Sequence, residues 1–304
     1  MQITTRGSLA GLNAYQIKVI AVAAMTLDHL AAYGFEIPMI GSAYYRLRVI
    51  GRIAMPLFLF VLTDSIRYTR SRPRLLLRLY LAAAGTGLFT AVTNYFFGYT
   101  VGHFVMSNIF YTYLYVAIYV ILTERILEAV KSRNWKKGLL LAAGILATAI
   151  PHFLWSFLLF RVDNTALSMT LEQRMLLRDL IESFVMSPWN VEYTLLFVLM
   201  GVMMYFARNK YGKAAVLVGF SMLCYFGNSL LLGDTPLGTW LNLKTPIHTV
   251  MGALQSRMIL AVPLMLLYNG KKGKCSKWFF YLYYPLHRYA ISVIAYLYLL
   301  FFAG

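Results

Sequence analysis

At 304 residues the chain is long enough for about two soluble domains, but 60% of its residues are apolar and only 13% are charged. Soluble chains carry ~25% charged residues, so the composition excludes a soluble protein. Only two cysteines, Cys224 and Cys275, are present and they lie far apart, which excludes a disulfide scaffold.

Nine stretches are apolar and long enough to predict membrane-spanning helices, each of which needs ~20 residues. They are residues 15–34, 49–68, 75–97, 107–124, 138–160, 191–207, 213–232, 248–268 and 279–302. We therefore expect an all-α polytopic membrane protein with about nine transmembrane helices. No linker or repeat divides residues 1–304, so a single transmembrane domain is expected.

The net charge of +17 is concentrated at alternate joints between these spans. Cytoplasmic loops collect Lys and Arg, so the charge indicates orientation and not nucleic-acid binding. The opposite joints, residues 95–107 and 233–247, are almost uncharged. This alternation predicts a cytoplasmic amino terminus and an outside carboxyl terminus. The two unpaired cysteines and the nine spans suit a bacterial inner or plasma membrane. The charged joints hold Arg67, Arg70, Arg72, Arg74, Arg78, Arg125, Lys131, Arg133, Lys136, Lys137, Arg208, Lys210, Lys213, Lys271, Lys272, Lys274 and Lys277.

The long outer connection, residues 161–190, mixes charged residues with Leu and Met. Within it, residues 171–185 have the pattern of an amphipathic helix. We expect this helix to lie on the outer surface of the membrane.

Charged and polar side chains inside apolar spans are the candidates for function, because a charge at mid-membrane costs at least ~2.5–3.5 kcal/mol. At ~1.5 Å per residue, His29 lies about 7 Å and Arg52 about 5 Å below the same outer surface, on neighbouring antiparallel spans. Arg48 lies one turn from Arg52. The candidates are Asp28, His29, Arg52, Asp64, Asn108, Glu192, Gln255, Arg257, His287 and Arg288.

Two further features bear on the same region. Asp28 is turned ~100° from His29 around the helix, so we expect it to pair with Arg52 or orient a neighbour. Pro56 has no N–H and leaves the carbonyl of Arg52 without a helical partner. Arg257 and His287, eight or nine residues into their spans, are expected nearer the midplane.

A histidine beside several arginines has two chemical interpretations. Histidine removes a proton from a hydroxyl or an amine near neutral pH, and arginine stabilises an oxyanion or binds an anionic group. This combination fits acyl transfer, and it also fits a transporter for an anion. The five histidines and two cysteines show no metal-binding spacing, so no metal site is expected.

Several ordered blocks give the sequence a resemblance to a known family. Besides Asp28–His29, they are RLRVIGRIAMPLF (Arg46 to Phe58), RYTRSRPRLLLRL (Arg67 to Leu79), SNIFYTY (Ser107 to Tyr113), LMLLYNGKKGK (Leu264 to Lys274) and FYLYYPLHRYAI (Phe280 to Ile291). The chain resembles the TraX family of integral-membrane acetyltransferases, first associated with conjugative pilin acetylation. That family is similar to membrane acyltransferases that use a buried histidine and cytosolic acyl-CoA. Residues 138–190 match this pattern little, so acceptor recognition cannot be carried over.

The resemblance implies acetyl-CoA as the donor. Its phosphates suit the cationic cytoplasmic rim, although orientation alone explains those charges equally well. Our hypothesis makes His29 the general base, with Asp28 beside it and with Arg52 and Arg48 stabilising the acyl oxygen. The candidates for binding the donor are Arg48 at the thioester, Arg257 and His287 along the inner pantetheine path, and Arg67, Arg70, Lys271 and Lys272 at the rim.

The acceptor is expected at the outer face, as a pilin amino terminus or a sugar hydroxyl of an envelope polymer, and the sequence leaves both open. The alternative is a transporter or flippase for an anionic lipid or metabolite. A third possibility is a scaffold for a secretion or conjugation complex. Membrane lipids are expected partners and nucleic acid is not.

Overall fold

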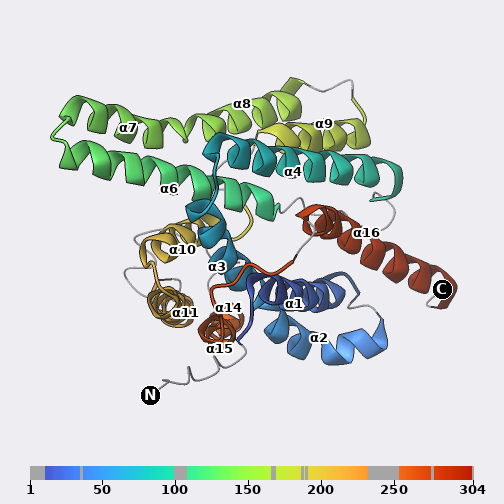
Figure 1. Cartoon of the computed structure of the whole chain (residues 1–304). Coiled ribbons are helices and arrows are strands. Elements are labelled where there is room, and N and C mark those ends of the chain that lie inside the picture. Colours follow the sequence, from blue (N-terminus) through green and yellow to red (C-terminus); the bar gives the residue numbers. More distant parts are fainter. Residues whose placement is uncertain are drawn as a thin grey trace, which may run out of the picture.

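The computed structural model describes residues 11–34, 37–98, 108–165, 169–185, 188, 191–231, 253–274 and 277–302. Within these ranges all regular elements are helices, apart from an isolated bridge between Leu12 and Tyr268 (Figure 1). The all-α prediction is confirmed. The helices are α1 (Ala14–Gly34), α2 (Pro38–Gly51), α3 (Ala54–Arg67), α4 (Arg72–Thr93), α6 (Ile109–Lys131), α7 (Trp135–Ala147), α8 (Ile150–Thr165), α9 (Leu171–Phe184), α10 (Thr194–Phe206), α11 (Lys210–Leu231), α14 (Ala253–Ser256), α15 (Val262–Leu266) and α16 (Lys277–Phe302), with a π-helical turn η1 (Asn94–Gly98) and a 3₁₀ turn η2 (Arg257–Ala261).

Five helical segments of the described residues are long and apolar enough to cross a membrane. Four of them agree with predicted spans to within three residues at each end: Ala14–Gly34, Arg72–Phe96, Trp135–Val162 and Phe279–Phe302. The nine spans and the orientation of the termini stay predictions. The fifth segment is Pro38–Arg67, which begins eleven residues before the predicted span 49–68, and two shorter apolar helices are Leu195–Phe206 and Leu254–Leu266.

Several of the predicted features lie outside the described residues. Of the two weakly charged joints, residues 233–247 lie wholly outside the described residues and residues 95–107 lie largely outside them. The same holds for residues 248–252 of the eighth predicted span, for Ser107 and for Cys275. Cys224 is described and is a free, buried thiol.

The second predicted span begins earlier than expected and is interrupted. Helix α2 starts at Pro38, whose missing N–H is not needed in a first turn. The chain leaves regular α-helix at Arg52 and Ile53 and resumes it as α3. Pro56 accounts for the interruption, because it cannot donate to the carbonyl of Arg52. The break places Arg52 at a turn inside the bundle.

Helix α1 packs against α2, α3 and α16, while α4 packs against α6 and α9. In Figure 1 helices α7 and α8 follow one another along the top, α6 lies against α7 and α4 lies against α9, and all of them stand above α1 and α2. Helix α10 contacts α3, α6 and α11 and joins the two groups. The α7–α8 segment is barely buried, so its apolar side chains suit contact with lipid.

Helix α9 forms where the sequence predicts a helix at residues 171–185, and it lies against the bundle. It packs along α4, and its residues Asp179 and Ser183 are buried. The amide of Asn94 donates to Asp179 (2.8 Å), and the hydroxyl of Tyr111 donates to the carbonyl of Ser183 (2.8 Å). Burial also raises the pKa of the Glu182 carboxyl above its ordinary value. Asp179 and Ser183 therefore find their partners in the protein, while Glu172 and Gln173 at the start of α9 are exposed.

The close approach of α4 and α9 depends on Gly87, where an added Cβ would lie 2.7 Å from the Cα of Ser183. We expect Gly87→Ala to lower the free energy of unfolding by about 1–3 kcal/mol, because α9 must move. Gly85→Ala in the same helix is the matched control. No atom lies within 4 Å of its Cβ position, so it should be neutral or stabilise the helix by up to ~1 kcal/mol. Thermal unfolding in detergent measures both, and equal effects would contradict this account of the packing.

The helix ends that the charge pattern assigns to the cytoplasm lie together. Arg72 at the start of α4 pairs with Glu124 near the end of α6 (2.6 Å). The hydroxyl of Tyr205, near the end of α10, donates to the same carboxylate. Lys210 at the start of α11 donates to the carbonyl of Leu266 at the end of α15 (2.7 Å). The described ends thus follow the predicted alternation, while the side of the membrane that they face stays a prediction.

Candidate active site

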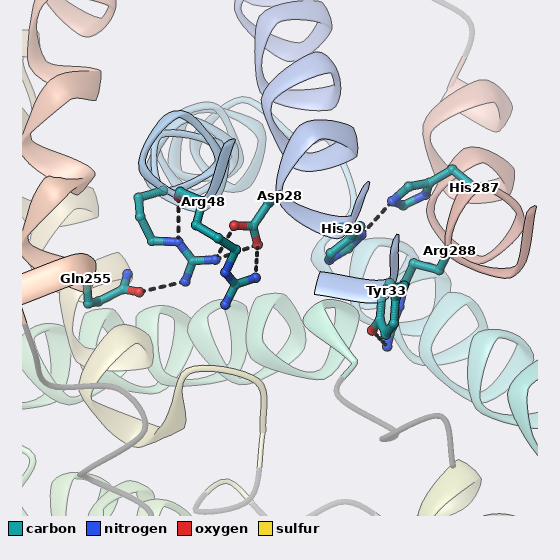
Figure 2. Close-up of polar contacts among 8 residues, drawn as sticks. Asp28, His29, Tyr33, Arg48, Gln255, His287 and Arg288 are labelled. Carbon is teal, nitrogen blue, oxygen red and sulfur yellow. Dashed lines mark hydrogen bonds and ion pairs between the residues drawn. The ribbon is translucent and has the colours of Figure 1, made fainter. Parts of the chain in front are cut away.

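Asp28 and His29 lie in the last third of α1 and reach different neighbours (Figure 2). Successive helical residues are turned by ~100°. As a result Asp28 faces α2 and His29 faces α16, and α1 packs against both of these helices. The end of α1 therefore joins two polar clusters that come from distant parts of the sequence.

The first cluster is an ion network centred on the buried carboxylate of Asp28. Arg48 donates to it at 3.0 Å, and the Nη2 group of Arg52 donates to both of its oxygens. Arg52 also donates to the side chain of Gln255 (3.0 Å) and to the carbonyl of Arg48 (3.3 Å). Asp28 thus forms the predicted ion pair with Arg52. Because two arginines face one carboxylate, the network of Asp28, Arg48 and Arg52 carries a net positive charge.

Gly51 makes this network possible. An added Cβ at Gly51 would lie 2.3 Å from the Cβ of Asp28, so no other residue type permits this approach of α1 and α2. The sequence analysis did not single out this glycine. Its place directly before Arg52 is the signal that was available.

The second cluster joins His29 to α16. The Nδ1 atom of His29 lies 2.7 Å from the Nε2 atom of His287, and the two rings are stacked (Figure 2). The Nδ1 atom of His287 lies 2.7 Å from the backbone carbonyl of Tyr283. His287 was expected nearer the midplane than His29, and this contact shows that the expected difference in depth was wrong. Counting residues from the end of a span assumes that all spans are parallel and end at one level.

More polar groups surround this pair than the sequence analysis assigned. Arg288 is buried and donates to the hydroxyl of Tyr33 at 2.6 Å. The hydroxyl of Tyr284 donates to Glu192 at 2.8 Å. Glu192 and Arg288 were candidates because they are charged residues in apolar segments. Nothing local distinguishes Tyr33 or Tyr284 among the 23 tyrosines.

A cavity of about 170 Å³ runs beside α1. One end is bordered by Lys18, Ser65 and Leu75, and the other by Asp28 and His29. Lys18 and His29 are eleven positions apart, which corresponds to about 16 Å of helix rise. Mostly apolar side chains line the middle, including Val22, Met25, Met55, Phe58, Leu62 and Leu79.

Tyr193 borders the same cavity and has a left-handed backbone conformation, with a φ of 66°. A bulky residue rarely adopts this conformation, and such strain is concentrated at functional sites. Glu192, the preceding residue, also borders the cavity. The backbone at the start of α10 is therefore held at the His29 end of the cavity by tertiary packing, against the conformational preference of Tyr193 itself.

The predicted donor-binding residues of the rim lie near the Lys18 end of the cavity but do not border it. Arg67 donates to the carbonyl of Tyr205, and its guanidinium lies over the ring of that residue. Arg70, Lys271 and Lys272 are exposed. The carbonyl of Lys271 accepts a hydrogen bond from the amide of Ala14 (2.8 Å), which holds this segment beside the start of α1.

Arg257 is not brought into the site. It is exposed at the point where α14 changes to 3₁₀ geometry, and it does not border the cavity. Gln255 of the same segment contacts Arg52 instead. Among the described residues, no group of three or more His, Cys, Asp and Glu residues could hold a metal ion.

One known family is similar to the part of the chain that supplies the Asp28 network. Residues 13–157 match a family model described as TraX protein. This segment is similar to TraX proteins. The TraX match includes the site residues Asp28, His29, Arg48 and Arg52. No curated protein and no solved structure matches the chain.

The extent of the TraX match refines the resemblance seen in the sequence. The match covers the first three blocks and helices α1 to α7 with the first half of α8. It continues past residue 138, where we expected the resemblance to weaken. The two carboxyl-terminal blocks, and His287 with them, lie beyond the TraX match, so the resemblance there stays a prediction.

Proposed function

We propose that this chain is a membrane-embedded acetyltransferase, which moves an acetyl group from cytosolic acetyl-CoA to an acceptor at the outer face. The TraX match supports acetylation, because the TraX family is linked to pilin acetylation. The structural observation that carries the proposal is the cavity. It connects the end of the bundle where the basic residues gather with the imidazole of His29.

The cavity and its rim suit the two chemically different parts of acetyl-CoA. The uncharged pantetheine arm matches the apolar middle of the cavity. The phosphates match the exposed cations of the rim, since charge-assisted hydrogen bonds from Arg and Lys are the usual ligands of phosphate. In this proposal Arg67, Arg70, Lys271 and Lys272 bind the nucleotide end of the donor.

In the proposed reaction His29 is the general base. It takes the proton of the acceptor's amine or hydroxyl while that nitrogen or oxygen bonds to the acetyl carbon. The carbon–sulfur bond then breaks, and the CoA thiolate takes up the proton from His29. The net products are the acetylated acceptor and CoA.

Positive charge near the Asp28 network would stabilise the acyl oxygen. The Arg52 side chain already donates to Asp28, Gln255 and the carbonyl of Arg48. By contrast, the Nε atom of Arg48 is buried and has no hydrogen-bond partner among the described residues. Arg48 therefore has the spare donor, and Arg52 holds Asp28 in place. Neither arginine borders the cavity, so in this proposal their charge acts on the acyl oxygen from behind Asp28 and Gly51, which do border it.

The test uses purified protein in lipid nanodiscs and acetyl-CoA that carries a radiolabel on the acetyl group. A peptide with a free amino terminus and an oligosaccharide are supplied as acceptors, and transfer or slow hydrolysis is followed. Label on the peptide or on the sugar decides between amine and hydroxyl. Absence of acetyl-CoA binding contradicts the donor assignment and favours the transporter, whereas binding without turnover points to an acceptor other than the two supplied.

A substitution at the mouth of the cavity tests the donor path. Ser65 borders the cavity and is exposed, so a large side chain fits there without disturbing the core. We expect Ser65→Trp to weaken acetyl-CoA binding at least about tenfold, or ~1.4 kcal/mol. Leu81→Trp on the exposed face of α4 (58% exposed) is the control. Equal affinities for the two variants would contradict the proposed path.

A further inference from the structure

The hydrogen bonds between α1 and α16 form a chain with a defined direction. It runs from the carbonyl of Tyr283 to Nδ1 of His287, and from Nε2 of His287 to Nδ1 of His29. Both distances are 2.7 Å, which is short for nitrogen donors and indicates real hydrogen bonds. His287 is buried, so water does not compete for these contacts.

The carbonyl at one end decides where the protons lie. A carbonyl oxygen only accepts hydrogen bonds, so Nδ1 of His287 must carry a proton. In the neutral ring the Nε2 atom of His287 is then an acceptor, and Nδ1 of His29 must donate to it. The proton of neutral His29 is therefore on Nδ1, and its Nε2 atom holds a lone pair.

The Nε2 atom of His29 is free to accept a proton from a molecule in the cavity. No described residue forms a hydrogen bond with it, and the imidazole borders the cavity. A ring with this protonation accepts a proton from a molecule in the cavity, whereas the other tautomer presents an N–H there. The arrangement follows the logic by which a fixed partner holds a catalytic imidazole in the productive tautomer.

We propose that His287 is a positioning residue that uses the carbonyl of Tyr283 to hold His29 in the Nδ1–H tautomer, with Nε2 free as the base. Its catalytic consequence rests on the proposed acetyl transfer. The tautomer itself is a property of the protein and is measured without any substrate. The earlier assignment of His287 to the pantetheine path has no support from the cavity, because His287 does not border it.

The first experiment reads the tautomer directly. Protein labelled with ¹⁵N-histidine is studied by NMR in nanodiscs, at a pH where both rings are neutral, and the His29 signals are assigned as those lost in His29→Gln. The expected result is a protonated Nδ1 and an unprotonated Nε2 on His29. In His287→Phe the signals should shift toward the Nε2–H form. A protonated Nε2 on wild-type His29 would overturn the inference.

The second experiment separates hydrogen bonding from packing. The ring of His287 stacks on Tyr283 and on His29, with centroids 4.9 Å apart in both cases. His287→Phe keeps a stacked ring and removes both nitrogens. His287→Gln removes the ring and restores an acceptor and a donor.

The inference predicts that His287→Gln retains more transfer activity than His287→Phe, with His287→Phe reduced ~100-fold or more, as expected for a base in the wrong tautomer. A packing role predicts the reverse order, and that result would overturn it. Unfolding temperatures of the two variants show whether both are folded. If wild-type protein transfers no label, the proposed function fails, while the NMR result still decides the tautomer.

Discussion

Replacing His29 with Ala is expected to lower acetyl transfer by ~10²–10⁴-fold, the contribution of a positioned general base. The ring borders the cavity, and its only hydrogen bond among the described residues is with His287. Acetyl-CoA binding and the unfolding temperature should therefore change little. Initial rates of label transfer, measured with saturating donor, give the effect.

His152→Ala is the matched control for that measurement. His152 lies on α8, stacks against Trp155 and does not border the cavity. It should retain wild-type activity. Full activity in His29→Ala would remove His29 from the mechanism, and loss of acetyl-CoA binding in that variant would assign it to the donor site instead.

Replacing Asp28 with Ala is expected to lower the free energy of unfolding by about 3–5 kcal/mol, because it leaves two arginines without their carboxylate. Asp28 and Arg52 are both buried, with 6% and 8% of their surfaces exposed, so solvent compensates little for the loss. Denaturant or thermal unfolding in nanodiscs measures the change. Acetyl transfer should fall as well, since Asp28 anchors the end of α1 next to His29.

A second substitution tests whether unpaired charge is the cause. In Asp28→Ala combined with Arg52→Met, the charge that was paired with Asp28 is gone, and part of the lost stability should return. A simple sum of the two single effects would contradict an ion network centred on Asp28. A loss below about 1 kcal/mol in Asp28→Ala would be typical of an exposed pair and would contradict its burial.

The helical class and the Asp28 network could be predicted because each depends on local properties of the sequence. Apolar length identifies α1 and α16 almost to the residue. The spacing of Arg48 and Arg52 places both on one face of a helix, and depth counting brings that face to Asp28. The break after α2 also has a local cause, the proline at position 56.

The contacts of His29 could not be predicted in the same way. His287 is 258 positions away, and periodicity gives the face of a helix without saying which helix lies against it. Gln255 lies in a short helix and Glu192 in the turn before α10, within segments that hydropathy treats as ordinary spans. Hydropathy likewise does not show that Asp179 of α9 pairs with Asn94 of a neighbouring segment.

Helix α10 is shorter than a membrane is thick, and this bears on the surroundings of the cavity at the end of that helix. Its 13 residues rise about 20 Å, while the hydrocarbon core is ~30 Å thick. Phe197, Met200 and Met204 are fully buried, so other parts of the protein or water must occupy the remaining thickness at its ends. Glu192 and Tyr193 lie at one of those ends, beside the cavity. If α10 crosses the membrane, about 10 Å of the hydrocarbon thickness is left for other groups to fill at its ends, and the polar residues Glu192 and Tyr193 stand at the end beside His29.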